Sequence, residues 1–216
     1  MKLQSSEGLM DKTLWTDTVE HLLNQTASAN PTPGGGSISM VSAAFGLGLV
    51  IMALEVSNRR KNAPDGLSPL INEGRKILDA VRVSADADID VFNTFMSALS
   101  LPKSTEEEKA QRKQAIQYAT VKATEVPLSS ARLCVAALDV ATQAADIAHS
   151  NILSDVATGT LLLVAAGRGV LLNVDANLGS LRDRTLAEEY SQERTAQEVE
   201  FQKRASLVQQ RLDARR

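Results

Sequence analysis

Apolar residues dominate one stretch of the chain, residues 38–56, whose only polar side chains are Ser39, Ser42 and Glu55. Two prolines and three glycines stand just before it. Proline interrupts a regular helix and glycine adopts tight turns, so we expect a turn that leads into a buried helix over about residues 38–58. The stretch is long enough to span a bilayer, and no second segment looks comparably apolar. Its many small residues nevertheless favour the centre of a helical bundle over a membrane span.

Elsewhere the apolar residues recur at the spacing of amphipathic helices. The pattern predicts a first helix over residues 9–29 and another over residues 67–99, which an Ala-Pro-Asp-Gly turn precedes. The helix 67–99 carries Asp86, Asp88 and Asp90 between its two apolar faces. Because residues four apart share a helix face, Asp86 and Asp90 should lie together and Asp88 should point elsewhere.

The start of the following helix is marked by a local cap signal. Thr105 and Glu108 have the spacing of a capping box, which predicts a helix that begins there and continues toward residue 126. Pro127 should end this helix or open the next one, over residues 128–148.

Two further helices complete the chain. An apolar segment after residue 150 predicts a close-packed helix, with Ser154 or Asn151 as its cap and Asp155 in its first turn. From residue 181 the sequence becomes highly charged with sparse apolar positions. This composition predicts a long, exposed amphipathic helix over residues 185–216, suited to packing across a subunit.

These elements define the expected fold class. No strand pattern and no short repeat is visible in the sequence, so we expect an all-α protein. We predict a single domain over residues 1–216, built as a helical bundle around the buried helix at about 38–58. The charged amphipathic helix within residues 181–216 would be added to this bundle.

Composition and charge narrow the classes of partner. The net charge of −3 and an aromatic content of 3% argue against binding a phosphate backbone or stacking on nucleic-acid bases. The one cysteine, Cys134, precludes an internal disulfide and fits a reducing, cytoplasmic setting, and the first residues lack the apolar core of a signal peptide. His21 and His149 are far apart in sequence, so we expect no metal site.

The turn before the central helix, which reads Pro33-Gly34-Gly35-Gly36-Ser37, is the first candidate binding element. The Ser37 hydroxyl is expected to cap the helix by accepting a backbone N–H of its first turn. The other free N–H groups and the positive end of the helix dipole would attract an anion, which glycines allow to approach the backbone. The alternative interpretation is a tight turn without a ligand.

A second group of candidates consists of polar residues set in apolar helices. A carboxylate buried in such a place needs hydrogen-bond donors, so capping and bonding between helices would explain each residue alone. The whole set, taken together with the glycine turn, favours a functional site. Its members are Asp88, Asn151, Ser154, Asp155, Asn173 and Asn177.

Six short motifs add a resemblance to this interpretation. They are PTPGGGS at 31–37, DIDVF at 88–92, LPKSTEEEKAQR at 101–112, VPL at 126–128, NILSDV at 151–156 and NVDANL at 173–178. In order and spacing they resemble the cyclodeaminase/cyclohydrolase family, over nearly the whole chain from about Trp15 to Glu189. This family comprises the C-terminal domain of formiminotransferase-cyclodeaminase and stand-alone bacterial methenyltetrahydrofolate cyclohydrolases.

The resemblance implies an all-helical fold, a homodimer or higher homo-oligomer, a folate substrate, and no metal or redox cofactor. It implies one of two reactions. One is hydrolysis of 5,10-methenyltetrahydrofolate to 10-formyltetrahydrofolate, and the other converts 5-formimino-tetrahydrofolate to 5,10-methenyltetrahydrofolate and ammonia. Because the sequence shows no formiminotransferase segment, we expect the hydrolase. The cyclodeaminase and a non-catalytic folate-binding helical protein are the alternatives.

The same resemblance suggests roles for individual residues. Asp155 is the first candidate for the general base or the anchor of the pterin ring, and Asp88 is the second. The backbone of the glycine turn would bind a negatively charged or carbonyl part of the folate. Residues expected to contact or orient the substrate or water are Pro33, Gly34, Gly35, Gly36, Ser37, Asn151, Ser154, Asn173 and Asn177.

One segment departs from the family pattern. Where relatives carry a Gly-Lys-Lys-Lys-Tyr-like stretch after the central helix, residues 57–61 read Ser-Asn-Arg-Arg-Lys. The positive charge is kept, so Arg59 and Arg60 are candidates to pair with the glutamate tail of a folate. An exposed, solvated basic patch is the equal alternative. If the stretch contacts the folate tail or ring, the changed residues would alter substrate choice.

Overall fold

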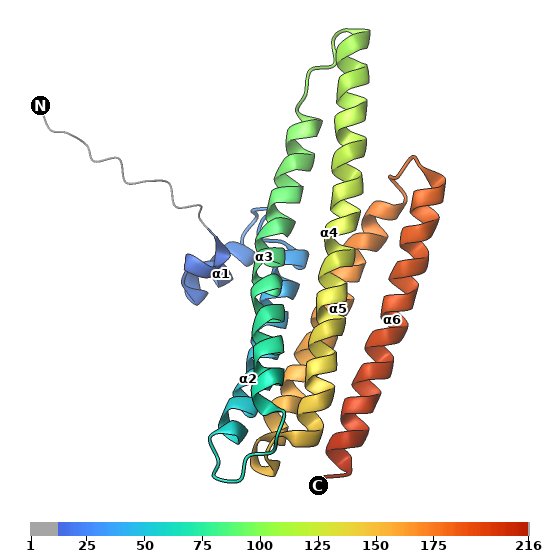
Figure 1. The fold of residues 1–216 in the computed structure, drawn as a ribbon. Coiled ribbons are helices and arrows are strands. Elements are labelled where there is room, and N and C mark those ends of the chain that lie inside the picture. Colours follow the sequence, from blue (N-terminus) through green and yellow to red (C-terminus); the bar gives the residue numbers. More distant parts are fainter. Residues whose placement is uncertain (1–12, 216) are drawn as a thin grey trace, which may run out of the picture.

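A computed structural model describes residues 13–215, which form six α-helices and two short 3₁₀ turns (Figure 1). No strand occurs in this part of the chain, so the all-α prediction is confirmed. The helices are α1 (Val19–Thr26), α2 (Gly35–Asn58), α3 (Leu67–Leu99), α4 (Glu106–Ile147), α5 (Leu153–Leu178) and α6 (Arg184–Asp213). The 3₁₀ turns are Leu14–Thr16 and Ser150–Ile152.

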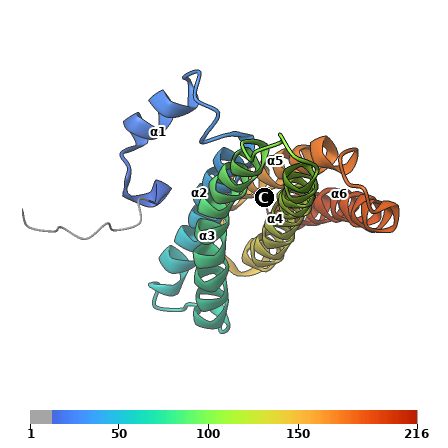
Figure 2. The same cartoon turned by 90° about the horizontal axis from the view of Figure 1, so that it is seen from above.

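Helices α2 to α6 run side by side along one long axis, and α1 stands beside this bundle (Figures 1 and 2). Helix α2 contacts α3, α4 and α5, as predicted for a central helix. Its side chains Met40, Leu47 and Leu54 recur every seventh residue and are fully buried. Burial of one such stripe in a bundle supplies most of the stability of a helix like α2.

The small residues of α2 allow its backbone to touch that of α5. A Cβ atom placed on Gly46 would lie 2.9 Å from the carbonyl oxygen of Gly159. One placed on Gly159 would lie 2.5 Å from the carbonyl oxygen of Gly46. Both distances are shorter than any side chain tolerates, so only glycine permits this crossing.

Two helical segments are long and apolar enough to cross a membrane, α2 and residues 150–178. The expectation that no second segment compares with the central helix was therefore wrong. Within the apolar windows of these segments, 61% of residues in α2 and 44% in the second segment are buried inside the protein. Length and composition alone do not separate a core helix from a membrane span.

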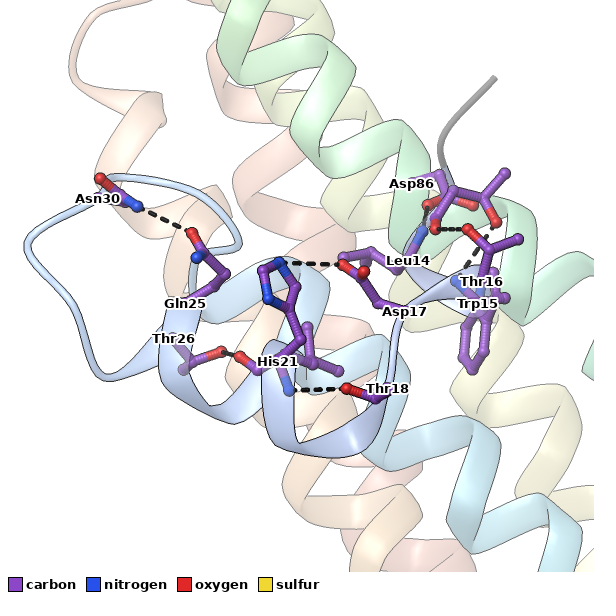
Figure 3. A network of polar contacts seen from close by, with 12 residues as sticks. Leu14, Trp15, Thr16, Asp17, Thr18, His21, Gln25, Thr26, Asn30 and Asp86 are labelled. Carbon is purple, nitrogen blue, oxygen red and sulfur yellow. Dashed lines mark hydrogen bonds and ion pairs between the residues drawn. The ribbon is translucent and has the colours of Figure 1, made fainter. Parts of the chain in front are cut away.

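The N-terminal segment differs from the predicted helix over 9–29. Residues 9–12 lie outside the described residues, and the rest forms the turn Leu14–Thr16 and the separate helix α1. Thr18 starts α1 by accepting the N–H of His21 on its hydroxyl, at 3.1 Å (Figure 3). Threonine side chains that bond to nearby backbone compete with helix continuation, which explains the interruption. The Leu14 N–H attaches the segment to α3 through the carboxylate of Asp86, at 2.8 Å (Figure 3).

Helix α4 passes through Pro127 without a break, which corrects the prediction of two helices meeting there. Proline has no N–H, so the carbonyl of Ala123 loses its usual helical partner. The side-chain amide of Asn177 on α5 donates to this carbonyl at 2.8 Å. It also donates to the carbonyl of Asn173, one turn earlier on its own helix, at 2.9 Å. A side chain from the neighbouring helix thus replaces the missing backbone donor.

Cap predictions succeeded where the sequence signal was strong. Thr105 and Glu108 form the predicted capping box, and α3 spans the predicted residues 67–99. The predicted cap of α5 was wrong, because the N-cap is Ile152, whose apolar side chain cannot accept a hydrogen bond. Neither Ser154 nor Asn151 is therefore its cap, although Asp155 does lie in the first turn.

Helix α6 packs onto its own chain. Phe201, Val208 and Leu212 are buried in the same core as α2 and α5, and α6 contacts both α4 and α5. These three apolar positions are thus buried within one chain, whereas Val199 on the same helix remains exposed. Arg216, the last residue of the predicted helix, lies outside the described part of the chain.

We predict that Asn177→Ala lowers the free energy of unfolding by about 1–3 kcal/mol, because it leaves the Ala123 carbonyl without a donor. Pro127→Ala restores an N–H at that point of α4. In the Pro127→Ala background the loss caused by Asn177→Ala should therefore be smaller. Urea unfolding of the four proteins of this double-mutant cycle measures the difference. Equal losses in both backgrounds would contradict the proposed pairing.

Candidate functional site

The start of α2 is held by a carboxylate from α3. The sequence predicted that Ser37 caps α2. The N-cap is instead Gly34, and Ser37 is the third residue of the helix. Ser37 is fully buried, and its N–H and hydroxyl donate to Oδ2 of Asp88 at 2.9 and 2.8 Å. The free N–H of the first turn therefore finds its acceptor 51 residues further along the chain.

This arrangement changes the interpretation of the glycine turn. The positive end of a helix dipole stabilises an anion, and here the anion is the protein's own Asp88. The Ser37 N–H is already taken by this carboxylate, so it is not free to bind an external anion. A ligand at this place meets a carboxylate oxygen beside the remaining N–H groups of the first turn.

Three helices approach closely at Gly36. A Cβ atom on this residue would lie 2.1 Å from Oδ1 of Asp88 and 2.5 Å from Nδ2 of Asn173. Gly36 thus brings α2 against the polar side chains of α3 and α5. At the preceding residue, Gly35, a Cβ atom would meet no described atom within 4 Å.

A cavity of about 340 Å³ opens at this junction of α2, α3, α4 and α5. Its volume is in the range of sites that hold one small molecule or part of a larger one. Phe92 and Phe95 on α3 and Pro127 on α4 form much of the apolar wall. The polar wall comes from the glycine turn and from Asp88, Asn173 and Asn177.

The side chains of the two asparagines that line the cavity differ in their hydrogen bonds. Both donors assigned to Asn177 Nδ2 go to backbone carbonyls, so this side chain supports the wall of the cavity. The amide of Asn173 makes no hydrogen bond to another residue of the described chain and lines the cavity beside Asp88. Asn173 is therefore the better placed of the two to orient a ligand.

Not every residue of the predicted turn reaches this cavity. Gly34, Gly35 and Gly36 line it, whereas Pro33 lines a neighbouring hollow with Ile89. Ser37, which the sequence had predicted to contact substrate, lies behind the cavity wall with no exposed surface. Its role is to hold Asp88.

The remaining predicted site residues lie at the opposite end of the bundle. Asp155 is in the first turn of α5 and Asn173 is near its end, 18 residues later. At about 1.5 Å per residue, this separates them by about 27 Å along the helix. Asp155 cannot therefore act in the cavity of Asp88 in the same chain. The same end carries the other residues that the structure separates from the cavity, namely Arg59, Arg60, Asn151 and Ser154.

Sequence reasoning missed the aromatic wall of the cavity. Phe92 and Phe95 follow Asp88 by four and seven residues, so all three share one face of α3. This spacing was a readable signal. The position of Pro127 was not, because it depends on the hydrogen bond from α5.

Ionisable groups with shifted pKa values lie outside this cavity. A hydrogen bond from Lys122 lowers the pKa of the Glu125 carboxyl. Burial, together with a 2.8 Å hydrogen bond to Glu125, raises the pKa of Tyr190 to about 12. Burial also raises the pKa of Cys134 to about 12, as expected for an unreactive core thiol.

Metal ligands are not assembled in the described chain. Between residues 13 and 215, no group of three or more His, Cys, Asp or Glu side chains is placed to hold a metal ion. His21 pairs with Asp17, and His149 lies against Arg60.

Comparison with known proteins places these observations in context. The family model described as formiminotransferase-cyclodeaminase matches residues 18–196. A methenyltetrahydrofolate cyclohydrolase of Methylorubrum extorquens is 35% identical over 80% of this chain and 85% of its own. A formimidoyltransferase-cyclodeaminase of Gallus gallus is 30% identical over 96% of this chain, which spans 39% of the chicken protein.

A solved structure has the same fold. The formiminotetrahydrofolate cyclodeaminase of Thermotoga maritima superposes with a TM-score of 0.82, over 93% of this chain and 98% of its own. The two sequences are 22% identical. The predicted bundle architecture is confirmed by this match.

We predict that Gly36→Ala disrupts the junction of the three helices, because the added methyl group collides with Asp88 and Asn173. The expected loss in the free energy of unfolding is about 1–3 kcal/mol, as for other overpacked sites. Gly35→Ala is the matched control, since its methyl group enters open space, and it should leave stability unchanged or slightly raised. Thermal unfolding of both variants checks this, and equal behaviour would contradict the described packing.

Proposed function

The chain belongs to the formiminotransferase-cyclodeaminase family, and from this premise we propose that it hydrolyses 5,10-methenyltetrahydrofolate to 10-formyltetrahydrofolate. The observation that carries the proposal is the Asp88 carboxylate, fixed through one oxygen at the wall of a cavity of molecular size. The similarity to the Methylorubrum extorquens cyclohydrolase, over 80% of this chain, supports the choice of reaction.

The chemistry of the substrate suits this cavity. The methenyl group carries a positive charge shared between N5, the bridging carbon and N10. A carboxylate beside it favours binding of this cation, and the aromatic side chains of Phe92 and Phe95 offer flat apolar surface to the ring system. The free amide of Asn173 can hydrogen-bond to polar edges of the ring.

Hydrolysis requires a proton acceptor near the bridging carbon. Water adds to this carbon and loses a proton to Oδ1 of Asp88, which gives a neutral tetrahedral intermediate. The bond from the carbon to N5 then breaks, N5 takes up the proton held by Asp88, the hydroxyl proton leaves to solvent, and the carbon remains on N10 as a formyl group. Overall one water is consumed and one proton is released to solvent. Because Ser37 holds Oδ2, the other oxygen is oriented before the substrate arrives.

The cyclodeaminase reaction is the second candidate. N10 adds to the formimino carbon and passes its proton to the formimino nitrogen, which gives a similar tetrahedral carbon. The formimino nitrogen then takes a second proton from solvent and leaves as ammonia. The similarity to the chicken formimidoyltransferase-cyclodeaminase supports this reaction. This chain spans 39% of that protein, so the transferase activity is not part of the proposal. A non-catalytic folate-binding protein would bind the substrate without accelerating either reaction.

The setting of the reaction follows from the same proposal. Water and protons balance the hydrolysis, so we propose that it needs no metal and no redox cofactor. A cytoplasmic location is supported by the single, buried and free Cys134, which suits a reducing compartment.

We also propose that the chain forms a homodimer or higher homo-oligomer. Phe45 and Met52 on α2 and Leu161 and Leu172 on α5 leave large apolar side chains exposed, with Leu161 71% accessible. On each helix the two residues recur at a spacing that keeps them on one face. Exposed apolar residues gathered on neighbouring helices suit contact between copies of a chain.

Loss of the proton acceptor should abolish turnover and spare the fold. We predict that Asp88→Asn lowers kcat/KM for methenyltetrahydrofolate by about 100-fold or more, because an amide cannot take the proton from water. The measurement is the decay of substrate absorbance in a buffer that keeps spontaneous hydrolysis slow.

Asp90→Asn is the matched control, since Asp90 is an exposed aspartate on the same helix, and it should keep near wild-type activity. Full activity of Asp88→Asn would contradict the mechanism, and a loss only in Asp155→Asn would move the reaction to the other end of the bundle. Absence of accelerated decay in the wild type, with ammonia released from 5-formimino-tetrahydrofolate, would favour the cyclodeaminase.

We predict that Leu161→Glu converts the assembly to smaller species, because a charge cannot be buried in an apolar contact without a partner. Val83→Glu on α3 is the control, because Val83 is similarly exposed at 70% but lies on another helix. Size-exclusion chromatography with light scattering measures the mass of each assembly. An unchanged mass for Leu161→Glu, or an equal change in both variants, would reject this face as the interface.

A further inference from the structure

A second cavity lies far from Asp88, beside the loop after α2. This loop is at the lower end of the bundle in Figure 1. The cavity has a volume of about 250 Å³ and lies where the loop after α2 meets the junction of α4 and α5. Arg60 is 24 residues beyond Gly36, most of them within α2, so the two cavities are about 35 Å apart. The described residues that line this cavity include Arg60, His149 and Arg215. None of them is an aspartate or a glutamate.

The contact between Arg60 and His149 has an unusual hydrogen-bond balance. Nδ1 of His149 accepts the backbone N–H of Asn151 at 3.2 Å. A neutral imidazole carries one proton, on Nδ1 or on Nε2, and accepts a hydrogen bond through the other nitrogen alone. This Nε2 lies 2.8 Å from Nη1 of Arg60, which can only donate. Two donors, the Asn151 N–H and the Arg60 guanidinium, therefore compete for a single ring acceptor, and one of them is left unmatched.

The ring of His149 is not free to escape this conflict by shifting with its backbone. The His149 N–H donates to the hydroxyl of Ser57 at 2.8 Å, and this hydroxyl donates to the carbonyl of Ala53 at 2.7 Å. Ser57 is buried, so the backbone of His149 is fixed to the end of α2. The donors of Arg60 and His149 are held at the mouth of one cavity.

A second arginine adds positive charge to the same cavity. Arg215 donates to the carbonyls of Ala145 and Ala148 at 2.6 and 2.7 Å, at the end of α4. Its position is thereby set, while its guanidinium remains part of the cavity wall. The hydroxyl of Ser150 and the side chain of Asn62 supply further polar groups to the lining.

We propose that this cavity binds an oxyanion, a phosphate or carboxylate group that accepts hydrogen bonds from both Arg60 and His149 Nε2. With Nδ1 accepting the Asn151 N–H, an anion with two or more oxygens accepts from Nε2 and from Arg60 at once, which removes the competition and compensates the local positive charge. The site is separate from the folate cavity and does not depend on the proposed reaction. Its ligand is a free small anion or the anionic end of a larger molecule.

The test is binding of inorganic phosphate and of succinate to the full chain, followed by calorimetry and by thermal unfolding. Sodium chloride at equal ionic strength serves as the reference for general salt effects. We expect saturable binding and a rise in melting temperature with at least one of the two anions. The comparison of phosphate with succinate identifies which oxyanion the site prefers.

Neighbouring arginines provide matched variants. Arg60→Gln should weaken the binding about tenfold or more, because it removes a charged donor. Arg59→Gln removes the same charge one residue away, outside the cavity lining, and should change the affinity by less than about twofold. Both arginines are exposed, so neither substitution disturbs the core.

Several results would overturn the proposal. Lack of saturable binding by either anion, or equal losses in Arg60→Gln and Arg59→Gln, would show that only general charge attraction acts here. The measurement needs no turnover, so failure of the folate hydrolysis leaves this result unaffected. Asp88→Asn should retain full anion binding, and loss of binding in that variant would place the anion in the other cavity.

Discussion

The hydrogen bonds from Ser37 to Asp88 determine the rest of the site. They give the first turn of α2 an acceptor for a backbone N–H that would otherwise be buried without one. They also fix α2 to α3 beside the point where Gly36 meets Asn173 of α5. One oxygen of the carboxylate therefore serves the fold and the other belongs to the cavity. The same side chain thus supports the fold and, in the proposed mechanism, takes the proton from water.

Most of the helices could be predicted from the sequence because their signals are local. The capping box at Thr105 and the apolar periodicity of residues 67–99 depend only on neighbours in the chain. The continuity of α4 through Pro127 could not be predicted in this way, because it depends on a donor from α5. The prediction of one helix over residues 9–29 was wrong although its signal is local, since Thr18, which starts a separate helix there, is visible in the sequence.

The sequence allowed candidate site residues to be selected, but not which of them lie together in the folded chain. Polar side chains in apolar helices, together with the glycine turn, selected Asp88 and Asn173, which line one cavity. The same criterion also selected Asp155, which the rise of a continuous α5 puts at the far end of the bundle. The prediction of one helix after residue 150 already contained this separation. What the sequence lacked was the pairing across helices, such as Ser37 with Asp88, which no spacing along the chain encodes.

The replacement of a backbone donor at Pro127 by Asn177 links two distant positions. With proline at 127, an amide at 177 is needed, and without the proline that need disappears. Natural selection therefore acts on the pair rather than on either residue alone. Among related chains, descent with modification should keep or lose the two together. A lineage that exchanged the proline would be released to use residue 177 for contact with its ligand, and so to change what the cavity accepts.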